Sequence, residues 1–262
     1  MISDAQATTP RRHLLSELGF GIRSVGEELH GTAVVTPEMH VPGTAHLRTS
    51  VLATWADTLI GLLATRTMAP RVPVTLELEV HLYRPAPATG TVRSIARIVR
   101  AGRSVFVAGA EFTQDDGEPL AVASGSFMAS PYPGSLPALQ SIDVPPQEQR
   151  LSMPLAERAG CERRGPGEAV LPRSEDGLNA SDSINGGLIA LAAEEALLSL
   201  APGSTLCSLG LRYVQAARVG PLVATATMHS GLGQLELRDT GNGHRLTGTA
   251  TGRAVTDSGW SQ

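Results

Sequence analysis

Apolar and polar residues follow two different periods along the first half of the chain. In residues 48–66, "RTSVLATWADTLIGLLATR", apolar side chains cover nearly the whole circumference of a helix. Such a pattern predicts a helix buried on all sides rather than one lying on a surface. In residues 72–86, "VPVTLELEVHLYRPA", apolar and polar residues alternate, which predicts a strand with one face against a core.

Further strands are predicted on either side of this helix–strand pair. Residues 20–37 favour one strand that ends at Pro37. Residues 90–128 favour three more, with Gly102 and the "DDG" of residues 115–117 as turn signals. The first half therefore reads as a strand, a long buried helix and about four antiparallel strands.

The second half repeats this order. A short strand is predicted in residues 165–174, a loop in "NASDSINGG" (179–187) and a helix in "LIALAAEEALLSL" (188–200). Strands follow in residues 205–228 and 234–254, with a hairpin at Asn242-Gly243. The repeat is weak in identity but consistent in element order, which is the more informative property.

The repeat predicts an α+β fold of two tandem hotdog domains, each a long central helix wrapped by an antiparallel β-sheet. Two such units usually pair through one continuous sheet, so this chain would form an intrachain pseudo-dimer. The expected boundaries are a disordered tail at 1–12, an N-terminal domain at 13–129, a Pro-rich linker at 130–155 and a C-terminal domain at 156–262.

Composition narrows the class of partner. The chain is 42% hydrophobic and 18% charged, enough apolar material for a core, and its net charge of −4 argues against nucleic-acid binding. No apolar run suits a signal peptide or a membrane span, so a cytoplasmic protein is expected. Cys161 and Cys207 lie far apart and are predicted to be reduced thiols, and the histidines show no metal-ligand spacing.

Three phrases of the first half carry a family resemblance: "VLATWADTLIGLLA", "LELEVHLYRPAPATGTVRSIARIVRAGRSVFV" and "DDGEPLAVASGSF". They resemble the hotdog-fold acyl-CoA thioesterases, particularly the phenylacetate-pathway branch. In the second half the likeness rests on "NASDSINGGLIALAAEE" and the order of the strands. Coenzyme A would enter as part of the substrate, and no separate cofactor is expected.

The family pattern is an Asn, five residues, then His-Gly-Gly, with an acid eight residues after the first Gly. The second half matches it with Asn179, Asn185, Gly186, Gly187 and Glu194, where Asn replaces the His. The resemblance implies that the N–H of Gly186 binds the thioester carbonyl, because glycine permits close approach and a helix N-terminus favours developing negative charge.

In the first half the acid of the pattern is Asp57, and Arg48-Thr49-Ser50 replaces the residues of the oxyanion loop. The resemblance gives the acid the role of base or nucleophile, and a Ser or Thr at the start of the next strand, here Thr75, helps to position water. A structural buried acid remains the alternative for Asp57, and Glu194 is either a second acid or a relic.

Helix geometry decides how these residues combine. Gly186 and Glu194 are eight residues apart, so they stand roughly 12 Å apart along one helix, too far to serve one thioester carbon. We therefore expect Gly186 to serve Asp57 of the other helix. The converse site, Thr49 with Glu194, lacks the glycines and is expected to be degenerate.

Three arginines, Arg97, Arg100 and Arg103, could bind the phosphates of coenzyme A through bidentate contacts; the alternative is a solvated hairpin edge. The leading hypothesis is hydrolysis of an acyl-CoA or acyl-carrier-protein thioester. A hydratase or dehydratase of the same fold would require a His near the start of the helix, and neither predicted helix contains one. The alternative is a non-catalytic acyl-CoA-binding protein or sensor. The loss of the glycines in the first half and the Asn in place of His in the second half both support it. Further pairing of chains stays open.

Overall fold

The chain folds around two long helices. The computed structural model describes residues 13–131, 142–146 and 148–261. Helix α1 spans Thr49–Met68 and α3 spans Gly186–Ser199. Both are buried around most of their circumference, as their apolar patterns predict, and they contact each other.

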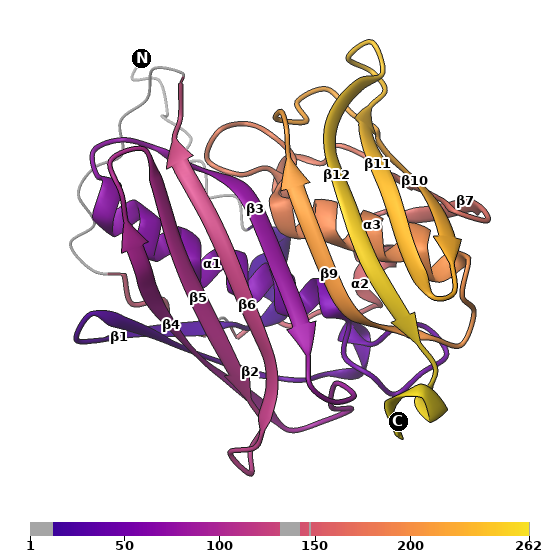
Figure 1. Cartoon of the computed structure of the whole chain (residues 1–262), viewed down its shortest axis with the longest axis horizontal. Helices are drawn as coiled ribbons and strands as arrows, with labels where there is room; N and C mark the ends of the chain where they lie inside the picture. The colour runs from indigo at the N-terminus through magenta and orange to yellow at the C-terminus, as the bar shows by residue number, and fades with distance from the viewer. Residues whose placement is uncertain (1–12, 132–141, 147, 262) are drawn as a thin grey trace, which may run out of the picture.

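One sheet packs against both helices (Figure 1). All of its strand pairs are antiparallel, and its order is β1-β2-β4-β5-β6-β3-β9-β12-β11-β10-β8-β7. The predicted class, helices with an antiparallel sheet, is therefore confirmed. The strands are β1 (Gly21–Val25), β2 (Glu28–Val34), β3 (Pro73–Leu82), β4 (Thr91–Ala101), β5 (Val105–Thr113), β6 (Pro119–Ala129), β7 (Glu162–Gly165), β8 (Glu168–Leu171), β9 (Thr205–Tyr213), β10 (Leu222–His229), β11 (Leu232–Asp239) and β12 (Arg245–Val255).

The two halves join where β3 pairs with β9, from Glu77 opposite Arg212 to His81 opposite Ser208. On the helix side of this joint, buried leucine and valine side chains alternate with the polar outer face. On the outer face, Arg212 forms ion pairs with Glu77 and Glu79 at 3.1 and 3.5 Å. The joint therefore brings α1 and α3 side by side beneath one continuous sheet (Figure 1).

Two hairpins stand where the pattern predicts single strands. Residues 20–37 form β1 and β2, because Gly26 at φ +61° allows the chain to reverse between them. Residues 162–171 form β7 and β8, with Gly167 at φ +80° in the turn. The two short strands of such a hairpin look like one strand in the sequence, because no break in the apolar pattern marks the turn between them.

Short helical segments complete the chain: η1 (Leu14–Leu18), η2 (Pro37–Met39), α2 (Leu155–Arg158), η3 (Glu175–Gly177) and η4 (Asp257–Ser261). The predicted tail at 1–12 lies outside the described residues, as does part of the predicted linker at 130–155. Within the described part of that linker, Val144 and Ile22 exchange backbone hydrogen bonds at 2.7 and 2.8 Å. The predicted domain boundaries stay a prediction.

Candidate active site between α1 and α3

The N-terminus of α3 is capped by the side chain of Asn185. Its Oδ1 accepts a hydrogen bond from the N–H of Gly187 at 2.8 Å. No acceptor among the described residues takes the N–H of Gly186, the first residue of the helix. Since helix N-termini leave N–H groups unpaired, this one is free for an oxygen of negative character.

The loop before α3 is held by Asn179. Its Oδ1 accepts hydrogen bonds from the N–H groups of Ser181 and Ser183 at 2.9 and 3.2 Å, and from Oγ of Ser183 at 3.0 Å. These contacts all lie within the loop, so the structure gives Asn179 a part in shaping the approach to Gly186. It does not bring Asn179 to the predicted acid.

Asp57 of α1 lies against the first residue of α3. A Cβ built on Gly186 would lie 3.1 Å from Oδ2 of Asp57. Thr75, at the start of β3, donates a hydrogen bond from Oγ1 to Oδ1 of Asp57 at 3.1 Å. The structure thus brings Asp57, Gly186 and Thr75 together from three separate elements. Their catalytic roles stay a prediction.

The surroundings of Asp57 favour its neutral form. Burial raises the pKa of the carboxyl group from 3.8 to about 6, although the hydrogen bond from Thr75 works in the opposite direction. The residue is partly buried rather than fully enclosed. A carboxylate with a pKa close to neutral and some access from outside suits a general base.

Tyr213, the last residue of β9, also belongs to this site, and the sequence reading did not select it. Its hydroxyl donates a hydrogen bond to the carbonyl of Gly186 at 3.2 Å. A signal existed, because aromatic residues make up only 3% of the chain and Tyr213 matches Tyr83 in the internal repeat.

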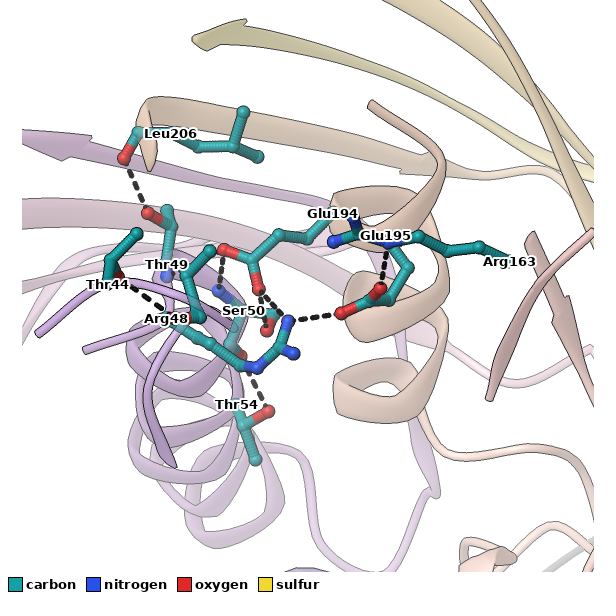
Figure 2. Close-up of polar contacts among 10 residues, drawn as sticks. Thr44, Arg48, Thr49, Ser50, Thr54, Arg163, Glu194, Glu195 and Leu206 are labelled. Carbon is teal, nitrogen blue, oxygen red and sulfur yellow. Dashed lines mark hydrogen bonds and ion pairs between the residues drawn. The ribbon is translucent and has the colours of Figure 1, made fainter. Parts of the chain in front are cut away.

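The opposite end of the helix pair shows a different arrangement (Figure 2). Glu194 of α3, fully buried, points at the N-terminus of α1. Its carboxylate accepts hydrogen bonds from the N–H of Thr49 at 2.8 Å and from the hydroxyl of Ser50 at 2.6 Å. The N-terminus of α1 therefore already holds an anion, supplied by the other helix.

Buried ion pairs hold this second arrangement in place (Figure 2). Arg48, with no exposed surface, contacts Glu194 at 3.2 Å and Glu195 at 2.6 Å. Glu195 is also paired with Arg163 of β7. Burial lowers the pKa of Arg48, but the two carboxylates outweigh it and the pKa is raised. The ion pairs therefore link two arginines with two glutamates.

The N-cap of α1 is Arg48, and Thr49 is the first helical residue. The hydroxyl of Thr49 donates to the carbonyl of Leu206 at 2.6 Å instead of capping its own helix. Capping comes from Glu194, which a local sequence pattern does not reveal.

The three predicted phosphate-binding arginines do not form one cluster with Asp57. Arg97 contacts Glu28 at 2.6 Å and Glu111 at 3.3 Å. Arg100 and Arg103 are exposed at the β4–β5 hairpin. Strand pairing places this end of β4 three strands from Thr75 along the sheet, roughly 14 Å away.

Other predicted features lie apart from this site. Cys161 and Cys207 are free cysteines, and burial raises the pKa of the Cys161 thiol to about 12. Within the described ranges, no group of three or more His, Cys, Asp or Glu side chains could hold a metal ion. No helix in the same ranges is long and apolar enough to cross a membrane.

Sequence comparison adds the family. A profile of the thioesterase superfamily matches residues 46–121, a segment that contains α1 with Asp57 and the start of β3 with Thr75. The match over this segment confirms the predicted resemblance to the thioesterases and supports the predicted class, a thioester hydrolase. The phenylacetate-pathway branch stays a prediction. No curated protein sequence matches the chain.

Solved structures share the fold over most of the chain. An acyl-ACP thioesterase from Bacteroides thetaiotaomicron VPI-5482 is similar at 15% identity and a TM-score of 0.62, over 87% of this chain and 98% of the other. A 12:0-ACP thioesterase from Umbellularia californica is similar at 11% identity and a TM-score of 0.61, over 89% and 99%. At these identities the likeness shows the fold alone, and that fold spans most of the chain.

Proposed function

We propose that the chain is a tandem hotdog enzyme which hydrolyses an acyl thioester at one composite site between its halves. The observation that carries the proposal is the contact of the Asp57 carboxylate, from α1, with Gly186 at the free N-terminus of α3. A base and an oxyanion donor that lie beside each other are the two groups that acyl transfer to water requires.

The reaction follows from this arrangement. The thioester carbonyl oxygen accepts a hydrogen bond from the N–H of Gly186, while Asp57, held by Thr75, removes a proton from water. The water oxygen attacks the carbonyl carbon, and negative charge develops on the carbonyl oxygen beside the helix N-terminus. The C–S bond then breaks, the thiolate receives a proton, and a carboxylic acid and a free thiol leave.

Only one of the two helix ends suits this chemistry. At the N-terminus of α1, Glu194 already accepts the N–H of Thr49, and an anion at that point excludes a second one. Glu194 is also fully buried and paired with Arg48, so no base is open to water there. Glu194 in this proposal is a structural residue.

The leaving thiol is proposed to be coenzyme A. Arg100 and Arg103 are exposed at the end of the sheet that holds Thr75, and a bidentate guanidinium suits a phosphate at the distal end of a pantetheine arm. Acyl carrier protein is the second candidate, because two structures of the same fold are named as ACP thioesterases.

The test is thiol release from acyl-CoA esters of short, medium, long and aromatic acyl groups, and from acyl carrier protein loaded with the same groups. Wild type is compared with Asp57→Asn and with Glu194→Gln, the matched residue of the occupied helix end. We expect Asp57→Asn to lower kcat/KM by about 100-fold or more, and folded Glu194→Gln to retain activity.

Two results would contradict the proposal. A wild type that binds acyl-CoA but releases no thiol from any ester is an acyl-CoA-binding protein. An active Asp57→Asn together with an inactive, folded Glu194→Gln places the chemistry at the other helix end.

A further inference from the structure

One peptide group at the start of α3 is held at both of its ends by side chains. The peptide that joins Gly186 to Gly187 presents its carbonyl to the hydroxyl of Tyr213 at 3.2 Å. It presents its N–H to Oδ1 of Asn185 at 2.8 Å. Glycine has unusual backbone freedom. Two side-chain hydrogen bonds to the same peptide group therefore restrict the backbone where it is otherwise most free to rotate.

The sheet brings the tyrosine to this point. Pairing of β9 with β3 ends at Arg212 opposite Glu77, so Tyr213 lies one residue beyond the joint. Arg212 reaches the outer face of the sheet, where it contacts Glu77. Successive side chains of a strand point to opposite faces, which directs Tyr213 toward the helices.

Tyr213 and Asp57 approach Gly186 together. A Cβ built on Gly186 would lie 3.1 Å from the hydroxyl oxygen of Tyr213 and 3.1 Å from Oδ2 of Asp57. Burial first, and the charge of Asp57 second, raise the pKa of Tyr213 well above its ordinary value. The hydroxyl therefore keeps its proton at neutral pH and remains a donor.

The other half lacks this arrangement. Tyr83, one residue beyond the end of β3, matches Tyr213 in the repeat, yet it is 64% exposed. The helix start that Tyr83 would serve is the one where Glu194 already takes the N–H of Thr49. The peptide held at both ends and the partly buried Tyr213 therefore occur at the same helix end as the unpaired N–H of Gly186.

We propose that Tyr213 is a positioning residue which, with Asn185, fixes the Gly186–Gly187 peptide so that the N–H of Gly186 faces the carbonyl of the bound thioester. The inference rests on the proposed hydrolysis. Tyr213 acts through Gly186 and donates no proton to the reaction, so its loss should affect the transition state more than the binding of substrate.

The experiment compares Tyr213→Phe with Tyr83→Phe in the full chain, using the acyl-CoA that wild type hydrolyses best. Tyr213→Phe should lower kcat about 10-fold or more, leave KM within about twofold and leave the acid limb of the pH profile in place. Tyr83→Phe should match wild type. Asn185→Ala combined with Tyr213→Phe should cost less than the product of the two single losses, because both act on one peptide.

Hydrogen–deuterium exchange supplies a measurement independent of turnover. A peptide covering residues 183–190 should exchange faster in Tyr213→Phe and unchanged in Tyr83→Phe. Wild-type kcat and unchanged exchange in Tyr213→Phe would overturn the inference, and so would a shift of the acid limb, which would mean that Tyr213 acts on Asp57 directly. An inert wild type with faster exchange in Tyr213→Phe would contradict the proposed hydrolysis and leave the positioning of the peptide intact.

Discussion

Glu194 on α3 accepts a hydrogen bond from the backbone N–H of Thr49, the first residue of α1, at 2.8 Å. Asp57 on α1 stands at the matching position, eight residues into its helix, and lies against Gly186, the first residue of α3. The acid therefore bonds directly to the first N–H of the facing helix at the α1 end, whereas at the α3 end the N–H of Gly186 is left without an acceptor among the described residues.

Glu194→Gln should destabilise the fold. The substitution leaves Arg48 buried with one carboxylate fewer, and breaking a buried ion pair typically costs 3–5 kcal/mol. Because glutamine keeps an acceptor for the N–H of Thr49, we expect a loss of about 3 kcal/mol in the free energy of unfolding, measured by urea denaturation. Glu236→Gln, which breaks an exposed pair with Arg238, is the control and should cost under about 1 kcal/mol. Equal effects of the two variants would refute a structural role for Glu194.

Asp57→Asn should stabilise the fold while it removes activity. The folded pKa of about 6 lies above the unfolded value of 3.8, so below pH 3.8 both states hold the proton and Asp57 makes no difference. As the pH rises from there to about 6, the unfolded state releases its proton first, and the wild type loses stability. Above pH 6 the variant should be more stable by about 2 kcal/mol, allowing for solvent access.

Thermal or urea unfolding of both proteins between pH 4 and pH 8 checks this dependence. The difference between the curves should grow through the interval and level off above pH 6. A constant difference, or one that favours wild type at pH 8, would show that Asp57 is stabilised rather than strained by its surroundings.

Thr75→Val should move the pH dependence of hydrolysis. The hydrogen bond from Thr75 lowers the pKa of Asp57, so without it the pKa should rise above about 6. The acid limb of kcat/KM should shift to higher pH, and activity at pH 6 should fall more than activity at pH 8. Thr205→Val, at the matching position of β9, is the control and should leave the limb in place. An unshifted limb in Thr75→Val would separate Thr75 from the ionisation of the base.

Gly186→Ala should lower activity without lowering stability. The new methyl group would lie 3.1 Å from both Asp57 and Tyr213, which forces one of them to move. Alanine also favours a helix over glycine by about 1 kcal/mol, which offsets the crowding. Gly61→Ala in α1 is the control, because its methyl group would meet Phe127 at an ordinary 3.7 Å. Loss of kcat/KM in Gly186→Ala alone, at equal or higher Tm, is the expected result.

Local patterns were sufficient for the two long helices and most of the strands, but not for the β1–β2 and β7–β8 hairpins. Periodicity indicates α1 and α3 because burial on all sides leaves an apolar circumference. The spacing of Gly186 and Glu194 on one helix predicted that Gly186 faces an acid of the other helix, and Asp57 does lie against Gly186. These features depend on neighbours within a few turns.

Long-range contacts were not predictable in the same way. The bond of Glu194 to Thr49 joins residues 145 positions apart, and that of Arg48 to Glu194 joins residues 146 apart. The sequence also does not reveal that the side chain of Asn185 accepts a hydrogen bond from the N–H of Gly187 rather than facing a substrate. Arg48, a cation where the other helix start has Asn185, was the available signal for a filled helix end.

The pairing of β3 with β9 means that one polypeptide supplies both walls of the candidate site. In a homodimer, each substitution at such an interface appears twice, once at each of the two equivalent sites. In this chain Arg48 and Asn185 can be substituted independently. The N-terminus of α1 can therefore be filled by a stabilising ion pair while the N-terminus of α3 stays open to a substrate. Formation of the site is also unimolecular, and specific activity should not fall when the protein is diluted.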